Sequence, residues 1–181
     1  MFTFSNPQIT IAIPADIAAI TALLNSAYRG ESSQQGWTTE AHLIGGDVRT
    51  DENNLQHVMD IPGSIILKYV NEQKEIVGCV NLQQKAGKVY LGMFSVSPHL
   101  QGFGIGKHIL TAAEEYALQL HCNIIFMQVI TQRTELIDWY KRHGYKDTGE
   151  RKPFKEDGLT GNHLQPLEFM VLEKNLELRV L

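Results

Sequence analysis

A glycine-rich turn is the segment of this sequence best suited to binding an anion. Gly102, Gly104 and Gly106 follow an apolar, strand-like run, and a helical pattern begins directly after them. Glycine lets the backbone approach a ligand closely, and the unpaired N–H groups of a helix N-terminus favour negative charge. Lys107 replaces the third glycine of a dinucleotide-binding turn, and no Ser or Thr follows it as in a P-loop, so neither motif fits. The turn therefore predicts a site for an anion such as a pyrophosphate, or else a tight strand-to-helix turn.

Tyr140 is the residue best suited to transferring a proton. The reference pKa of a tyrosine is about 10, so it is protonated at neutral pH, and a thiol lies within about two units of it. A tyrosine beside a departing thiolate could therefore act as its general acid. Tyr140 also shares a helical face with Leu136 and Ile137, which is typical of a core aromatic. Both roles stay open, and the anion site upstream favours the acid.

Strands and helices alternate in an order that predicts a mixed sheet. Residues 64–96 contain three runs of period two joined by short turns, which indicates an antiparallel meander. The last of these strands, the glycine turn, a helix and an apolar strand then form a βαβ unit, whose two strands should be parallel. The predicted strands are 8–13, 64–70, 75–84, 88–96, 122–130, 145–154 and 167–174, and the predicted helices are 16–28, 39–44, 50–59, 103–120 and 131–143. This order predicts a single α/β (α+β) domain over residues 1–181.

Local signals predict several details of these elements. Asp16 is expected to cap the first helix, and Thr131 or Thr134 the last one. Gly144 is expected to end that last helix in a left-handed conformation. Gly78 lies inside a strand, where it indicates a bulge or a close approach of another backbone.

Composition narrows the classes of function. The 181 residues carry a net charge of −4, which argues against a nucleic-acid partner. Cys79 and Cys122 are the only cysteines, and no ligand spacing links them to histidines, so neither a metal nor a disulfide is expected. The first seven residues lack the pattern of a signal peptide, and no apolar run is long enough to span a membrane. The sequence therefore predicts a cytoplasmic enzyme or binding protein without a membrane or nucleic-acid partner.

Two motifs together resemble the GNAT superfamily of N-acetyltransferases. Val96-x-Pro98 followed by Gln101-x-x-Gly104-x-Gly106 is similar to the acyl-CoA signature of that superfamily. The segment 139–145 is similar to its aromatic-Tyr-basic-x-x-Gly-aromatic segment. The element order matches from residue 9 to residue 172. The resemblance implies a mostly antiparallel sheet of about seven strands, helices on both faces, and a splayed parallel pair formed by 88–96 and 122–130.

The resemblance also implies a site for acetyl-CoA as co-substrate. Coenzyme A would enter the gap between the splayed strands, with its pyrophosphate at the glycine turn and its sulfur beside Tyr140. Backbone groups of the earlier strand would face the pantetheine and the acetyl carbonyl. The implied cofactor-binding residues are Phe94, Ser95, Val96, Gln101, Gly102, Phe103, Gly104, Ile105, Gly106, Lys107 and Arg133.

Two positions depart from the family pattern. Gln128 stands where many members carry a carboxylate, and an amide cannot accept a proton as a general base. Arg133 stands where many members carry an Asn that contacts pantetheine. An arginine there could bind a ligand carboxylate, bind a phosphate of coenzyme A, or face solvent.

The acceptor side resembles one GNAT subgroup of undefined acceptor, through the segments 36–41 and 149–154. Trp37, Glu40 and Phe154 would then border the acceptor cleft. In the structural alternative, Trp37 pins a helix to the sheet and Glu40 is an acid of the first helical turn. Acidic residues in these loops predict attraction of a cationic amine; they are Glu31, Glu40, Asp47, Glu150 and Asp157.

The function predicted from the sequence is transfer of an acetyl group from acetyl-CoA to a primary amine, with Tyr140 protonating the thiolate. A non-catalytic acyl-CoA-binding module is the alternative from another class, and a longer acyl donor is a third reading. The acceptor, a small molecule or a peptide, stays unnamed. Many family members pair through strands near the C-terminus, so the resemblance leaves a homodimer open.

Overall fold

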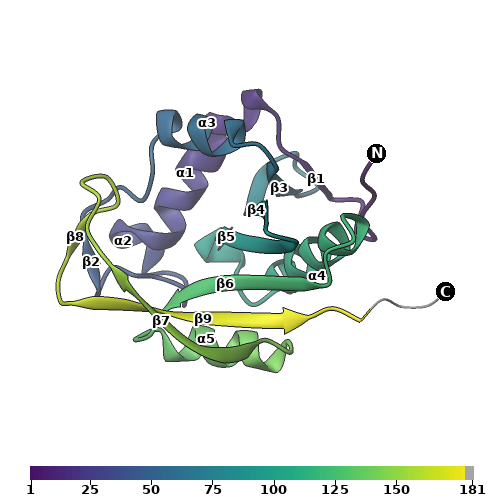
Figure 1. The fold of residues 1–181 in the computed structure, drawn as a ribbon. Coiled ribbons are helices and arrows are strands. Elements are labelled where there is room, and N and C mark those ends of the chain that lie inside the picture. Colours follow the sequence, from purple (N-terminus) through teal and green to yellow (C-terminus); the bar gives the residue numbers. More distant parts are fainter. Residues whose placement is uncertain (178–181) are drawn as a thin grey trace.

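The computed structural model describes residues 1–177, which are built around a seven-stranded sheet (Figure 1). The strand order is β1-β3-β4-β5-β6-β9-β7, and a separate two-stranded ribbon joins β2 to β8. The strands are β1 Ile9–Ile11, β2 Ile44–Gly45, β3 Ser64–Val70, β4 Ile76–Lys85, β5 Lys88–Val96, β6 Ile124–Ile130, β7 Lys146–Phe154, β8 Asn162–His163 and β9 Leu167–Asn175. The α-helices are α1 Ile17–Tyr28, α2 Gly30–Ser33, α3 Glu52–Asp60, α4 Ile105–Gln119 and α5 Thr134–Arg142. Short 3₁₀ turns cover Pro14–Asp16 and Pro98–Leu100.

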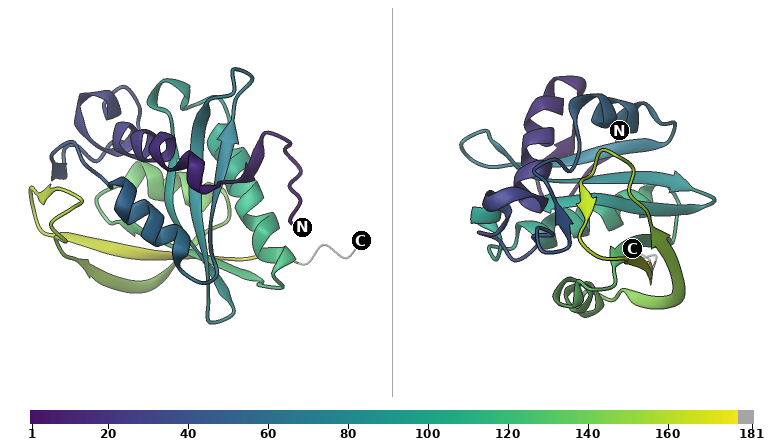
Figure 2. Two further views of the ribbon diagram at one scale, coloured as in Figure 1. Left: turned by 90° about the horizontal axis from the view of Figure 1, so that it is seen from above. Right: turned by 90° about the vertical axis from the view of Figure 1, so that its left-hand side faces the viewer.

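Helices cover both faces of the sheet, as the sequence predicts. One hydrophobic cluster packs α1 and α3 against Ile66 and Cys79 of the sheet. A larger cluster packs α4 and α5 against inward-facing residues of β3, β4, β5 and β6. Figure 2 shows α1 and α3 (purple to blue) on one side of the strands and α4 (green) on the other. The buried stripe of α4, which includes Ile109, Ala113 and Tyr116, follows the helical spacing of the sequence.

The parallel pair β5 and β6 separates toward the carboxyl ends of its strands. The two strands are paired only from Val89 to Leu91 on β5 and from Ile125 to Met127 on β6. All other strand pairs of the sheet are antiparallel. The pairing of β5 with β6 thus ends several residues before the strands themselves end at Val96 and Ile130. This confirms the predicted splayed pair within a mostly antiparallel sheet.

A β-bulge interrupts β5 where the two strands part. Ser95 pairs with Cys79 and Gly92 pairs with Asn81, so Met93 and Phe94 together face one residue of β4. Met93 has a φ of 50°, in the left-handed region that a side chain rarely adopts. A bulge changes the direction of the backbone groups of its strand, and here it leaves the Phe94 carbonyl to accept from the Tyr28 hydroxyl.

Several local expectations differ from the structure. The predicted helix over 39–44 is absent, because the Thr39 hydroxyl accepts from the N–H of Ala41 and holds a turn there instead. Asp16 takes the N-cap position of α1 as predicted, but its carboxylate forms no bond to that helix: it accepts from the N–H of Ile13 and pairs with Lys68. Neither predicted threonine caps α5, whose N-cap is Arg133 without a side-chain bond.

Two glycine predictions are confirmed. Gly144 follows α5 with a φ of 92°. A Cβ on Gly78 would lie 2.5 Å from Cδ1 of Ile109, so α4 packs directly on the bare backbone of β4. This close packing fixes the height of α4 above the sheet, and with it the position of the glycine turn.

Candidate functional site

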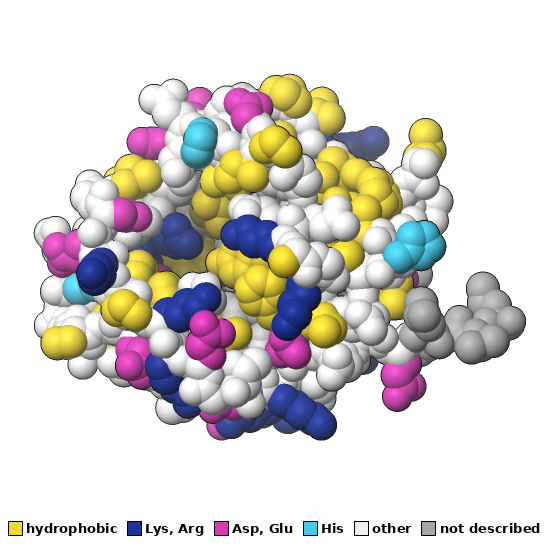
Figure 3. Space-filling view, viewed as in Figure 1, with side chains coloured by type: hydrophobic (Ala, Val, Ile, Leu, Met, Phe, Trp, Pro, Cys, Tyr) yellow, Lys and Arg dark blue, Asp and Glu magenta, His cyan; other side chains and the backbone are white. Residues whose placement is uncertain are grey.

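A cavity of about 650 Å³ opens at the splayed strands. Its walls come from the bulged end of β5, the N-terminus of α4, one face of α5 and the loop after α2. Figure 3 shows a hollow with a hydrophobic floor and Lys and Arg side chains around it. The predicted site residues that line the cavity are Trp37, Phe94, Ser95, Val96, Gln101, Gly102, Gly104, Gly106, Lys107, Arg133 and Tyr140.

The glycine turn has the geometry of an anion cradle. Gly102 and Gly104 have φ values of 90° and 86°, and a Cβ on either would meet no atom within 4 Å. They therefore serve the backbone conformation and leave open space beside the cavity. Gly104 is the N-cap of α4, so the N–H groups that follow it have no partner within the helix. These free N–H groups and the cation of Lys107 border the same cavity, which is the arrangement of an anion site.

Two predicted residues of the turn face elsewhere. The side chain of Phe103 is 77% exposed and does not line the cavity. Ile105 packs against the hydrophobic core, close to Gly78. These two positions contribute backbone and packing to the turn, and their side chains lie outside the cavity.

Gln101 ties the glycine turn to the loop after α2. Its Oε1 accepts from the N–H of Trp37 at 2.8 Å. Its Nε2 donates to the Thr38 hydroxyl at 2.7 Å and to the Val96 carbonyl at 3.1 Å. The Gln101 side chain is therefore engaged by the protein itself. It connects the wall that holds the anion cradle to the wall that carries Trp37.

Tyr140 lies between aromatic rings with its side chain facing the cavity. Its ring centroid is 5.2 Å from that of Trp139, 5.8 Å from Tyr145 and 6.2 Å from Phe94. No residue among 1–177 forms a hydrogen bond with its hydroxyl, although the residue as a whole is 4% exposed. A buried phenol facing a cavity without a partner is free to donate to a ligand.

Burial raises the pKa of Tyr140 well above 10, and the nearby Tyr28 raises it further, whereas the charge of Arg133 lowers it. The reference value used in the sequence prediction is therefore too low, because the phenolate is desolvated in this cleft. The phenol remains fully protonated at neutral pH. A thiolate in the same cleft is desolvated as well, so the proton affinities of the two groups rise together.

Tyr28 is a cavity residue that the sequence analysis missed. It ends α1, and its hydroxyl donates to the carbonyl of Phe94 at the bulge. Burial raises its pKa to about 12. The sequence shows only an aromatic in a helical stripe, which carries no signal for a contact with a strand 66 positions away.

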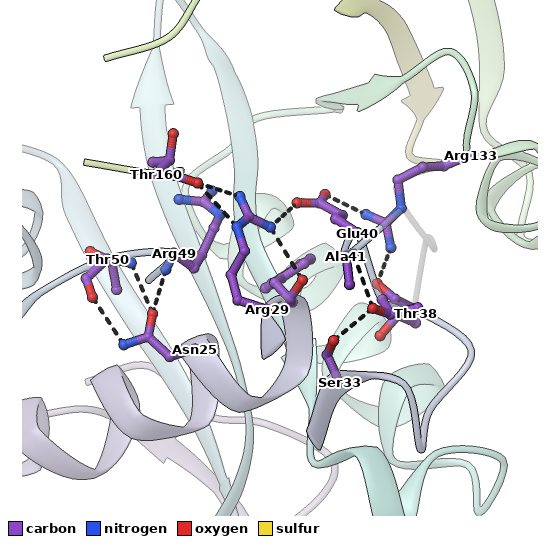
Figure 4. Close-up of polar contacts among 12 residues, drawn as sticks. Asn25, Arg29, Ser33, Thr38, Glu40, Ala41, Arg49, Thr50, Arg133 and Thr160 are labelled. Atoms are coloured by element: carbon purple, nitrogen blue, oxygen red, sulfur yellow. Dashed lines mark hydrogen bonds and ion pairs between the residues drawn. The ribbon is translucent and has the colours of Figure 1, made fainter. Parts of the chain in front are cut away.

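Behind this wall lies a buried ion cluster, formed by Arg29, Glu40 and Arg133 (Figure 4). Nη1 of Arg29 is 2.6 Å from one oxygen of Glu40, and Nη1 of Arg133 is 2.9 Å from the other. Arg29 also donates to the Thr160 carbonyl, and Arg133 to the Thr38 carbonyl. Burial alone would raise the pKa of Glu40, but the charges of Arg133, Arg29 and Arg49 lower it, so the carboxylate is ionised.

The structure excludes one sequence interpretation for each of two residues: Glu40 as an acid of a first helical turn, and Arg133 as a residue that faces solvent. Glu40 belongs to no helix, and both of its oxygens are already paired with arginines. Arg133 does not face solvent: its side chain is 8% exposed and lines the cavity. Arg29 was not expected at the site, because a lone arginine after a helix looks like a surface residue.

Trp37 and Phe154 do not share one cleft. Trp37 is 41% exposed and lines the cavity. Phe154 lies on a second, shallower pocket, where its ring stacks on Phe169 with centroids 4.3 Å apart and meets the ring of His163. The structure therefore places Trp37 beside the predicted cofactor site and Phe154 outside it.

Two general features of the described residues bear on the type of site. Within 1–177, no three His, Cys, Asp or Glu side chains gather in a way that could hold a metal ion. No helix in the same range is both long enough and apolar enough to cross a membrane. Cys79 and Cys122 are both free and buried.

Comparison with known proteins identifies the family. Residues 19–145 match the model of the acetyltransferase (GNAT) family, so the chain belongs to that family. Over 67 residues the chain is 31% identical to the spermine/spermidine N(1)-acetyltransferase of Bacillus subtilis strain 168. That match covers 36% of this chain and 44% of the relative, so less than half of the relative's length is compared.

Solved structures share the fold at lower identity. The ribosomal-protein-alanine N-acetyltransferase of Brucella melitensis is 18% identical, with a TM-score of 0.69 over 93% of this chain and 99% of that one. A Salmonella typhimurium protein solved with its cofactor acetyl-CoA is 21% identical, with a TM-score of 0.67 over 98% of both chains. At these identities the likeness shows the fold alone.

Proposed function

We propose that this chain is an N-acetyltransferase that moves an acetyl group from acetyl-CoA to a primary amine. The observation that carries the proposal is the cavity at the splayed strands, which joins the anion cradle of α4 to the unpartnered hydroxyl of Tyr140. Membership of the GNAT family supports acetyl-CoA as the co-substrate. Acetyl-CoA supplies an acetyl thioester, whose carbonyl carbon an amine can attack.

Different parts of the cavity would bind different parts of acetyl-CoA. The turn from Gly102 to Lys107 would hold the pyrophosphate, by its free N–H groups and the lysine cation. The bulged backbone at Phe94 and Ser95 would contact the pantetheine arm and the acetyl carbonyl. A backbone N–H aimed there in advance stabilises the negative charge that develops on the carbonyl oxygen.

Tyr140 would act as the general acid. As the amine nitrogen bonds to the acetyl carbon and the carbon–sulfur bond breaks, Tyr140 donates its hydroxyl proton to the sulfur. The proton that the amine loses leaves through solvent, and the phenolate regains one from solvent. Arg133 assists, because its charge favours the phenolate left behind and so lowers the pKa of Tyr140.

Thiol release with a panel of amines tests this function. We expect the chain to release free coenzyme A at a rate that depends on the amine added, and to bind acetyl-CoA in calorimetry. Binding of acetyl-CoA without amine-dependent thiol release would show a binding module instead. The same assay with a series of acyl-CoA donors measures acyl-chain length, for which we expect a preference for acetyl.

A further inference from the structure

The cluster around Glu40 carries three cations and one anion. Three guanidinium groups, those of Arg29, Arg49 and Arg133, surround the single carboxylate of Glu40 (Figure 4). Glu40 is ionised and both of its oxygens are occupied by Arg29 and Arg133. Arg49 forms no ion pair and no side-chain hydrogen bond with any residue in 1–177. This surplus is unusual, because buried or half-buried cations are normally paired.

The surplus lies beside the reacting centre. The guanidinium carbons of Arg49 and Arg133 are each 5.7 Å from the ring centroid of Tyr28. That ring lines the cavity, and its hydroxyl bonds the Phe94 carbonyl at the bulge. Two cations therefore lie around the tyrosine that touches the bulge, where the acetyl group is expected.

Both arginines keep donors for a ligand. A guanidinium has five N–H donors, and Arg133 uses one on Glu40 and one on the Thr38 carbonyl. The backbone N–H of Arg49 donates to Oδ1 of Asn25 at 2.6 Å, which fixes the start of its side chain and leaves the whole guanidinium available. Forked donors of this kind match the oxygens of carboxylates and phosphates.

We propose that the amine acceptor carries an anionic group, a carboxylate or a phosphoryl group, that binds beside Tyr28, on the side of the cleft where Arg133 and Arg49 lie. This inference deepens the proposed function and rests on it. The same surplus repels an acceptor with several ammonium groups and favours the neutral form of the attacking amine. The chain would thus differ from its polyamine-acetylating relative in acceptor class.

The anion of coenzyme A is a less suitable partner for Arg49. The anion cradle lies on the other wall, at the N-terminus of α4 with Lys107. Arg49 does not line the cavity that contains this cradle and reaches Tyr28 from outside its lining. Loss of Arg49 should therefore leave the affinity for acetyl-CoA unchanged.

Matched amines test the proposal at saturating acetyl-CoA. The panel pairs ω-amino acids and aminoalkyl phosphonates with their uncharged amides or esters, and adds spermine and spermidine. We expect kcat/KM to be at least about tenfold higher for an acid than for its uncharged partner or for a polyamine. Comparing the ω-amino acids with the aminoalkyl phosphonates shows whether the acceptor's anionic group is a carboxylate or a phosphoryl group.

Arg49→Gln tests the residue, because within 1–177 the Arg49 side chain forms no hydrogen bond or ion pair and its guanidinium lies over the face of the Tyr28 ring. We expect kcat/KM to fall about tenfold or more for the acids, to stay within about twofold for the amides, and to recover in part in Arg49→Lys. Lys88→Gln removes the same charge at the far end of β5, where Lys88 pairs with Glu173, and should leave acceptor preference unchanged.

Three results would overturn the inference, and they separate it from the proposed function. Turnover that favours polyamines or uncharged amides contradicts the anionic acceptor and leaves the acetyltransferase intact. A preference for acids that survives in Arg49→Gln contradicts the site. No turnover with any amine, despite bound acetyl-CoA, contradicts the proposed function, and the inference falls with it.

Discussion

The two walls of the cleft are built in different ways. The α4 wall is local: a glycine turn, a helix N-terminus and one lysine lie within six positions of each other. The opposite wall presents Arg133, which is held from behind by Glu40 and Arg29, and Arg49 lies on the outer side of Tyr28; these residues come from separate parts of the chain. A backbone cradle suits a ligand that is the same across a family, whereas side-chain charges can change with the acceptor. The predictions below test this division, beginning with Tyr140, which lies where the walls meet.

Tyr140→Phe should have the largest effect on activity. The ring and its aromatic neighbours stay, but the proton for the sulfur is lost. We expect kcat to fall by about 10²- to 10⁴-fold while the affinity for acetyl-CoA barely changes. The rate of thiol release measures kcat, and calorimetry on the same preparation measures the affinity for acetyl-CoA.

Tyr145→Phe is the matched control for that variant. Tyr145 is buried in the same aromatic cluster, and its hydroxyl donates to Glu114 at 3.2 Å. This variant should lose about 0.5–1.5 kcal/mol of stability and keep its turnover. If Tyr140→Phe behaved in the same way, Tyr140 would be a packing residue and the acid would lie elsewhere.

Glu40→Gln should have the largest effect on stability, because it leaves two buried arginines without their anion. We expect a loss of about 3–5 kcal/mol in the free energy of unfolding at pH 7, measured in urea. The folded protein that remains should keep its preference for acidic amines, since the positive surplus is larger still. A loss below about 1 kcal/mol would mean that the cluster is hydrated and its charges screened.

The stability difference between wild type and Glu40→Gln should depend on pH. The pKa of Glu40 is lowered in the folded state from its ordinary 4.5, so its contribution is present above that value and is lost as pH falls through the folded pKa. Wild type and Glu40→Gln should therefore converge in stability as the solution is acidified below about pH 4.5. A constant difference down to pH 2 would contradict an ionised Glu40.

Gly104→Asp should weaken acetyl-CoA binding by at least about tenfold, which is about 1.4 kcal/mol. The carboxylate would stand at the helix N-terminus and repel the pyrophosphate. Gly87→Asp is the matched control, because Gly87 also has a positive φ and open space around its Cβ position but lies in the β4–β5 turn. If calorimetry gave equal affinities of the two variants for acetyl-CoA, the glycine turn would not be the pyrophosphate site.

Gln101→Ala should have the smallest effect, since it removes two hydrogen bonds to a half-exposed loop and one to the Val96 carbonyl. We expect the acceptor KM to rise about threefold and the amide of Trp37 to exchange faster. Gln119→Ala is the control: Gln119 ties α4 to Thr3 by the same kind of paired bonds, far from the cleft. An unchanged Trp37 amide would show that Gln101 does not hold the loop.

The same division explains how much the sequence could predict. The strand order around β5 and β6, the glycine turn and the helix α4 follow from local periodicity and glycine spacing. Glu40 was predicted near the acceptor, but its arginine partners lie 11 and 93 positions away in the sequence. No local pattern encodes such a pairing, and a lone acid in a loop looks like a free charge. The β2–β8 ribbon was also missed, because strands of two residues are too short to show an alternation of apolar and polar residues.

Hydrogen exchange with and without acetyl-CoA tests the central claim most directly. We expect acetyl-CoA to protect amides at residues 94–96 and 102–108, with little change at 43–50 and 157–163 until an acidic amine product is added. Protection confined to the arginine wall, or none at the glycine turn despite measured binding, would contradict the assignment of the two walls.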